Sequence, residues 1–220
     1  MQSNRADLSE KTKQVTKLLK DRCSPLPVDD TERMMANIEK FIQRSCSPNV
    51  TTQSFLEDAI STTARMFDFT EMAVAVKDKS DGKYKYAAFV GMRGEAISAY
   101  KKLAYTFEEM ISASKFPRIR LDNFADFFHG EYTPIREGEI DTYNRPSMLS
   151  KDRASDDEWR EGDYICVYMH GSGSEVLGWF ELARSLNGKI PTRQTFKWLE
   201  LMASIVTMFL YEREYSGLRH

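Results

Sequence analysis

The sequence has little cysteine and no excess of positive charge. Its three cysteines, Cys23, Cys46 and Cys166, are an odd number without the spacing of a metal site. Such usage favours a reducing compartment over a disulfide-rich secreted fold, so we expect a cytoplasmic protein. The 31 Lys and Arg residues are outnumbered by 33 Asp and Glu residues, which leaves no surplus charge to neutralise a phosphate backbone. Nucleic acid is therefore not an expected partner.

Long hydrophobic runs are also missing. The uncharged stretch near the C-terminus covers residues 201–211, about half of the ~20 residues that cross a bilayer. The first residues, MQSNRADLSEKTKQ, contain no apolar core and do not predict a signal peptide. The sequence thus predicts no contact with a membrane.

Motifs for catalysis and metal binding are absent as well. The sequence contains neither a GxxxxGK[ST] phosphate loop nor an HExxH metal motif, and the GSGS at 171–174 precedes a predicted strand instead of a helix. His129 and His170 are the candidate ligands for a haem or a metal, but no Cys/His cluster accompanies them. We therefore assign no catalytic and no metal-binding residue.

Apolar spacing predicts helices in the first third of the sequence and hairpins after it. Helices are expected over about 7–22, from Asp29 to about Cys46, and from Thr51 onward. Runs rich in Val and aromatic residues flank short turns at 72–78 with 84–92 and at 163–170 with 176–183, which predicts two antiparallel hairpins.

Helices are also expected between and after the hairpins. One covers about 94–104, a short one follows the capping pair Thr106 and Glu109, and a long one begins after Thr192. Residues 117–162 are the least regular part, with short strands expected near 118–121 and 146–150. A long irregular segment within a domain is either disordered or functional.

The final third of the sequence resembles the end of a GAF domain, a small-molecule sensor module related to PAS. The resemblance rests on Gly162-Asp163 before the strand ICVYM, on the strand LGWFELA, and on NGKIPT before the helix FKWLELMASIVTMFLYE. It covers residues 50–215, and the order of the earlier elements agrees with it. Residues 1–49 are then an N-terminal helical extension that could serve dimerisation or signalling.

The resemblance implies an α+β fold. Its centre is an antiparallel sheet of about six strands, with the terminal helices packed on one face. On the other face, helices and loops from about 93–162 would enclose a ligand pocket. The candidate ligand-binding residues are Phe124, Phe128, Tyr132, Tyr143, Arg145, Cys166, Tyr168 and Trp179.

Two groups of these candidates have alternative interpretations. The loop aromatics either line a pocket or hold the loop against the sheet. Arg145, with Arg153, would bind an anionic ligand through its guanidinium. The stretch from Asn144-Arg145 to Glu158 resembles the Asn-Lys…Phe…Asp-Glu pattern of cyclic-nucleotide GAF domains, but the Phe before the acidic pair is missing, which disfavours a cyclic nucleotide.

Cys166 is either a sensing or attachment thiol or a small hydrophobic core residue. On a strand it shares a face with Tyr164 and Tyr168. GAF domains that attach bilins place the Cys beside a His or in an Asp-x-Cys-Phe setting, and this sequence has neither. GAF-type methionine sulfoxide reductases cluster their cysteines around the pocket, whereas Cys23 and Cys46 lie outside the resemblance.

The resemblance implies a cytoplasmic sensory or regulatory protein that binds a small molecule and relays a conformational change through its terminal helices. We expect a homodimer and a separate signalling partner, because no output domain is visible. One alternative is a methionine sulfoxide reductase-like enzyme that uses Cys166, and another is a ligand-free dimerisation scaffold. The cofactor stays unknown: haem or another pocket ligand is compatible with the module, and no motif indicates one.

Overall fold

The computed structural model describes residues 13–18, 29–133, 135, 138–173 and 175–215. The chain divides into two units, residues 1–40 and 41–220, and helix α2 (Asp30–Ser45) crosses the division. Most of the helix expected over 7–22 lies outside the described residues, although 13–18 are helical. Within the described ranges, no helix combines the length and apolarity needed to cross a membrane.

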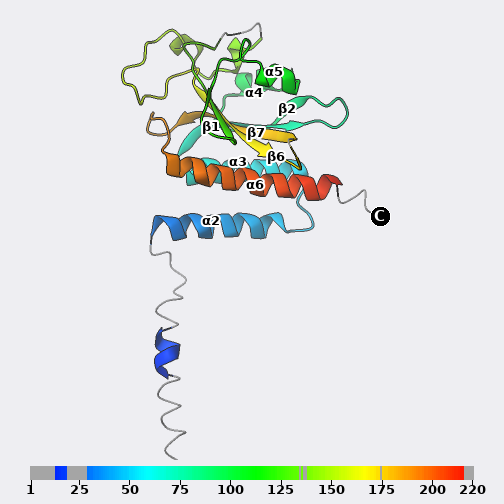
Figure 1. Ribbon diagram of the computed structural model, residues 1–220, viewed down its shortest axis with the longest axis vertical. Coiled ribbons are helices and arrows are strands. Elements are labelled where there is room, and N and C mark those ends of the chain that lie inside the picture. The colour runs from blue at the N-terminus through cyan, green and yellow to red at the C-terminus, as the bar shows by residue number, and fades with distance from the viewer. Residues whose placement is uncertain (1–12, 19–28, 134, 136–137, 174, 216–220) are drawn as a thin grey trace, which may run out of the picture. The chain divides into compact units, whose positions relative to one another are not determined.

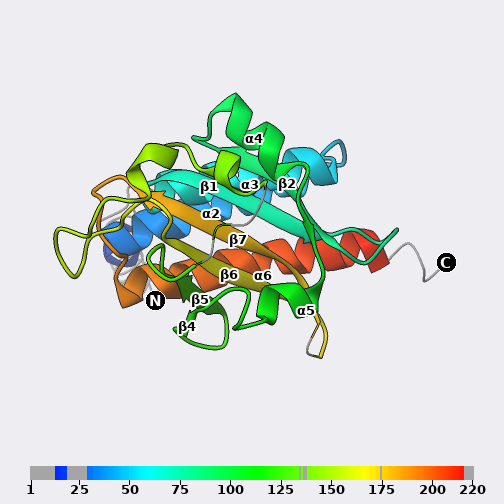
Figure 2. The same ribbon diagram turned by 90° about the horizontal axis from the view of Figure 1, so that it is seen from above.

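One antiparallel sheet of seven strands forms the centre of the second unit (Figure 2). The strands lie in the order β3-β2-β1-β7-β6-β5-β4. Both predicted hairpins, β1–β2 and β6–β7, are confirmed, and β1 pairs with β7 to join them. The strand bounds are β1 (Phe69–Lys77), β2 (Tyr84–Val90), β3 (Ala104–Tyr105), β4 (Ile119–Arg120), β5 (Ala125–Phe128), β6 (Tyr164–His170) and β7 (Val176–Ser185).

Helices cover both faces of this sheet. Figure 1 shows α3 and α6 on one side of the sheet and α4 and α5 on the other. The predicted α+β fold is confirmed, with one strand more than the six expected. The helical bounds are α3 (Thr52–Met66), α4 (Gly94–Tyr100), α5 (Phe107–Ile111) and α6 (Arg193–Tyr215), with 3-10 helices η1 (Ile140–Thr142) and η2 (Pro146–Met148).

Local capping fixes where the shorter helices begin. Thr51 and Ser54 exchange hydrogen bonds in a capping box at the start of α3. Thr106 and Glu109 do the same at α5, as the sequence predicts. At α2, the Asp29 carboxylate accepts a hydrogen bond from the Glu32 amide at 2.8 Å. Each cap satisfies amide groups that have no partner inside the helix.

Alternation along the strands separates the core into two layers. On β6, Cys166 and Tyr168 belong to the layer beneath α4 and α5, together with Trp179 of β7. The buried residues that alternate with them along β6, Ile165 and Val167, point to the opposite face, where α3 and α6 contact the sheet. The predicted division of faces on β6 is therefore confirmed.

The irregular segment contains the main departures from prediction. The strand expected near 146–150 is wrong: Pro146 begins the 3-10 helix η2 there, because proline suits the first turn of a helix and cannot donate to a sheet. Strand β5 (Ala125–Phe128) was not expected, since all four of its residues are buried and no polar alternation marks it. Helix α4 ends at Tyr100 instead of 104, and Ala104–Tyr105 pairs with β2 as β3.

Candidate functional site

A cavity of about 60 Å³ lies between the sheet and the segments that cover it on the side of α4. Drug-sized ligands occupy about 300–1,000 Å³, so this space suits a few waters or a ligand with few heavy atoms. The sheet contributes Glu71, Tyr86, Tyr164, Glu181 and Ala183 to its wall. Tyr105 of the edge strand β3 also lines it, and the cover contributes Met92, Tyr100, Leu103, Phe116, Thr133, Glu139, Thr142, Tyr143, Asn144, Glu161, Gly162 and Asp163.

Glu181 on β7 is a buried carboxylate of this wall. It is 5% exposed, and its Oε1 accepts a hydrogen bond of 2.7 Å from the Tyr100 hydroxyl. Its Oε2 accepts a second hydrogen bond, from the Tyr86 hydroxyl. Burial raises the pKa of Glu181, and the hydrogen bonds from the two tyrosines oppose that rise. The carboxyl group is thus held between two phenols of different elements, β2 and α4.

The two phenols that face Glu181 stay protonated. Burial, followed by the nearby Glu181, raises the pKa of Tyr86 and of Tyr100 well above that of an ordinary tyrosine. Their rings meet edge to face, with centroids 4.6 Å apart. They therefore act as fixed hydrogen-bond donors to the carboxylate.

Asn144 and Tyr105 hold the cover in place over the cavity. The Asn144 side chain accepts from the Arg93 amide and donates to the Gly91 carbonyl, both at 3.0 Å, at the junction of β2 and α4. The Tyr105 hydroxyl donates to Glu139 at 3.0 Å. Asn144, which belongs to the partial cyclic-nucleotide pattern, therefore bonds to the backbone between β2 and α4.

Arg145 is bound by two carboxylates of the cavity wall. Its guanidinium lies 2.7 Å from Glu161 Oε2 and 3.0 Å from Glu71 Oε1. Both acids are thereby paired, and the arginine does not line the cavity. The guanidinium that the sequence offered to an anionic ligand pairs with two carboxylates of the protein.

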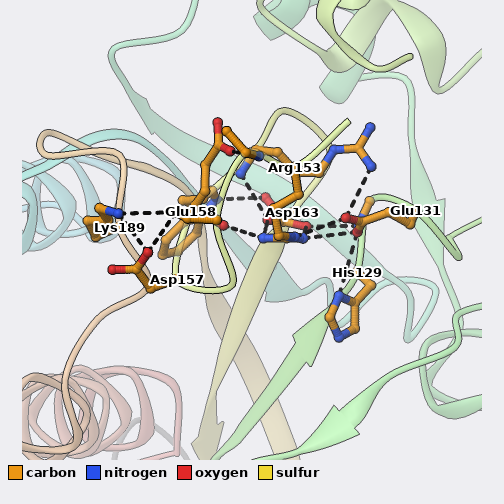
Figure 3. A network of polar contacts seen from close by, with 12 residues as sticks. His129, Glu131, Arg153, Asp157, Glu158, Asp163 and Lys189 are labelled. Carbon is orange, nitrogen blue, oxygen red and sulfur yellow. Dashed lines mark hydrogen bonds and ion pairs between the residues drawn. The ribbon is translucent and has the colours of Figure 1, made fainter. Parts of the chain in front are cut away.

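A second polar network fixes the segment from His129 to Asp163 (Figure 3). Asp163 is 1% exposed, and Arg153 contacts both of its carboxylate oxygens at 2.9 Å. Asp163 also accepts hydrogen bonds from the amides of Gly130 and Arg160. Arg153 binds Glu131 as well, through two hydrogen bonds of 2.9 Å. This network joins the start of β6 to the loop that follows β5.

Part of this network has the residue types of a metal site. Ligand atoms of His129, Glu131 and Asp163 lie within 4.8 Å of one another. The guanidinium groups of Arg153 and Arg160 already contact the two carboxylates. Because these positive charges neutralise the acids, the cluster acts as an ion-pair network.

The eight predicted ligand residues fall in different places. Tyr143 lines the cavity, while the other seven do not. Phe128 stacks on Tyr164 with centroids 4.4 Å apart. Tyr132 is 70% exposed, and Phe124 lies against the ring of His170.

The three candidates on the final hairpin belong to the core. Cys166 and Trp179 are fully buried, and the Tyr168 hydroxyl donates to the buried Asp126 carboxylate at 2.9 Å. Burial, followed by the nearby Glu181, raises the pKa of the Cys166 thiol well above its usual range. A nucleophilic thiol needs a lowered pKa and access to solvent, so Cys166 has the properties of a core residue.

Sequence reasoning missed Glu181, Tyr86 and Tyr100, the residues that meet inside the cavity. One signal was present for Glu181: it is a charged residue in the run VLGWFELA, which otherwise reads as a buried strand. Its partners lie 95 and 81 residues away in the sequence, and no local pattern connects them.

Solved GAF domains have the same fold at low sequence identity. One from a Coxiella burnetii phosphoenolpyruvate-protein phosphotransferase matches with a TM-score of 0.53 and 13% identity, over 84% of this chain and 96% of that one. One from a putative sensor histidine kinase of Pseudomonas syringae pv. tomato matches with a TM-score of 0.51 and 10% identity, over 93% and 97%. The A. aeolicus nlh2 GAF domain, in an inactive state, matches with a TM-score of 0.54 and 10% identity, over 84% and 99%. No protein-family model and no curated protein matches the sequence.

Proposed function

Because this chain has the GAF fold, we propose that it is a cytoplasmic sensory protein that binds a small molecule in the cavity beside Glu181 and relays the binding through its terminal helices. The observation that carries this proposal is the cavity itself, which places a buried carboxylate and several tyrosines around one space. Two of the similar domains come from a phosphotransferase and a putative sensor kinase, a regulatory context that supports a sensory role.

The cover supplies a physical route from the cavity to the rest of the domain. Tyr100 of α4 and Tyr143 both border the cavity, and Asn144 ties the same loop to the end of β2. A ligand that displaces either tyrosine would change how the loop meets the sheet. Binding shifts a conformational equilibrium only by such differences in contact between the two states.

Helix α6 offers a surface for the relay and for a homodimer. Leu201 and Met208 are exposed on it, one heptad apart, and Met208 is 61% exposed. Ile205 and Glu212 continue the four-three-four spacing, and with Met208 they border a cavity that the end of α2 also lines. We assign residues 1–49 as the N-terminal extension of this dimer and residues 50–215 as the sensor domain, with a separate partner that receives the signal.

A panel of small metabolites tests the proposal on the full chain. The expected result is one compound class that raises the melting temperature by several degrees and changes the dimer population in light scattering. Met208→Glu should abolish the dimer and retain the thermal shift, because Met208 lies outside the cavity. A filled-core scaffold predicts no thermal shift with any compound, and that result would overturn the proposal.

A further inference from the structure

We infer that the cavity beside Glu181 selects a small organic cation, a protonated amine with a few heavy atoms, and that Glu181 is its counter-ion. This inference rests on the proposed function and adds the chemical class of the ligand. Three properties of the cavity carry it, namely the charge of its wall, the aromatic residues that line it and its size.

The charge of the wall excludes anions. Among the described residues that line the cavity are five carboxylates, and none of the lining residues is Lys, Arg or His. Arg145 pairs with Glu71 and Glu161 from outside the wall, and Arg153 pairs with Asp163 in the same way. A carboxylate or phosphate ligand would therefore meet no cation and would be repelled by the acids.

Glu181 differs from these paired acids. Its two hydrogen bonds come from neutral phenols, the nearby indole of Trp179 is also neutral, and no described Lys, Arg or His contacts it. Each carboxylate oxygen can accept a further hydrogen bond, so the phenols leave acceptor capacity for a ligand. An ammonium group would supply both the missing positive charge and the donors.

The aromatic residues suit the same ligand. Tyr86 and Tyr100 flank the carboxylate, and Tyr143 lines the same cavity from the cover. An ammonium group that lies over the face of one of these rings is attracted to it, and the attraction grows when the site is shielded from water. Glu181 is 5% exposed, so an ion pair formed there would be screened weakly.

The volume limits the size of the cation. About 60 Å³ accommodates a ligand such as methylammonium or ethylammonium and is far too small for a nucleotide, a haem or a bilin. Polyamines and other long amines would have to leave most of their chain outside the cavity. The ligand class is therefore a short primary amine in its protonated form.

Calorimetric titration of the full chain with ethylammonium, acetamide and acetate, at constant ionic strength, tests this inference. The three probes have similar size and differ in charge. Ethylammonium should bind at least about tenfold more tightly than either of the others, because it alone brings a positive charge to the carboxylate. This comparison uses the wild-type protein and does not depend on the folding of any variant.

Two variants locate the binding. Glu181→Gln should weaken ethylammonium binding by about tenfold or more, since the amide keeps the shape and removes the charge. Glu175→Gln removes a carboxylate of the turn between β6 and β7 that pairs with Lys77 outside the cavity, and its affinity should equal that of the wild type.

The outcomes separate the inference from the proposed function. If acetamide or acetate binds as tightly as ethylammonium, or if Glu181→Gln binds ethylammonium as tightly as the wild type, a ligand site stands and the cation assignment is overturned. If none of the probes binds, the cation assignment is overturned as well. The metabolite panel then decides separately whether the domain senses a small molecule of another class.

Discussion

Tyr100 of helix α4 donates a hydrogen bond of 2.7 Å to Glu181 of strand β7, across 81 residues of sequence. This bond links the cover of the cavity to a strand near the middle of the sheet, between β1 and β6. A change in the charge or the contacts of Glu181 therefore acts directly on the position of α4. Glu181 therefore both lines the cavity with its carboxylate and contacts the helix that covers the cavity.

The stability of the protein should report the buried state of Glu181. Burial raises the pKa of this carboxyl, so the folded chain keeps a proton that the unfolded chain releases as the pH rises above about 4.5. The stabilisation linked to that proton is present below the unfolded pKa and is lost as the pH rises through the folded pKa. Glu181→Gln should therefore gain stability relative to the wild type from about pH 4.5 upward, measured by urea unfolding at several pH values.

Glu175→Gln is the matched control for that series. It removes one negative charge at a partly exposed position that pairs with Lys77. Its free energy of unfolding relative to the wild type should lack the rise with pH that is expected for Glu181→Gln. Parallel curves for the two variants would show that the proton of Glu181 does not influence folding.

The network around Asp163 should carry much of the stability of the covering loop. Asp163→Asn removes the charge that faces Arg153 at a site that is 1% exposed, and breaking a buried pair in this way costs about 3–5 kcal/mol. Asp157→Asn breaks an exposed pair with Lys189 that solvent screens, so it should cost far less stability. Denaturant unfolding measures both values. Equal losses would mean that the Asp163 pair has no special role.

The cysteines should differ in reactivity. Cys166 is buried and the pKa of its thiol is raised by that burial, whereas Cys46 is exposed. In the native protein, iodoacetamide should label Cys46 and leave Cys166 unlabelled, as determined by peptide mass spectrometry. Denaturation should expose Cys166 to the reagent. Rapid native labelling of Cys166 would instead favour the reductase alternative.

Two glycines with the same backbone conformation should respond differently to substitution. Gly82 and Gly91 have φ values of +69° and +68°. A Cβ at Gly82 meets no atom within 4 Å, so Gly82→Ala should cost only the strain of about 1–2 kcal/mol. A Cβ at Gly91 would lie 1.6 Å from the Thr70 carbonyl oxygen, so the backbone after β2 would have to move away from β1.

Thermal unfolding compares these two variants. Gly91→Ala should lose at least about 3 kcal/mol, or fail to fold, because the clash adds to the same backbone strain. Similar melting temperatures for the two variants would contradict the close approach of Gly91 to β1.

The sequence predicted the elements whose causes are local. The capping pair Thr106 and Glu109 and the turns of the two hairpins act over a few residues, and the structure has α5 and both hairpins in place. The resemblance of residues 159–212 to a GAF domain predicted the central sheet and the cover on each of its two faces. Strand β5 was not predicted, because its partner β6 lies far along the chain and both of its faces are buried.

The site was harder to predict than the fold. The loop aromatics and Arg145 were reasonable candidates by residue type, yet only Tyr143 among the eight lines the cavity. Arg145 is held by Glu71, which lies 74 residues away in the sequence. Such pairings depend on the register between strands and on how the cover packs on the sheet. The spacing of residues close together in the sequence predicts neither.

The pKa of the Glu181 carboxyl, measured by carbon NMR with and without ethylammonium, tests the central claim most directly. Loss of the resonance in Glu181→Gln identifies the signal. A cation bound against the carboxylate favours its charged form, so the pKa should fall when ethylammonium saturates the site. An unchanged pKa at saturating ethylammonium would show that no cation meets Glu181 and would contradict the claim.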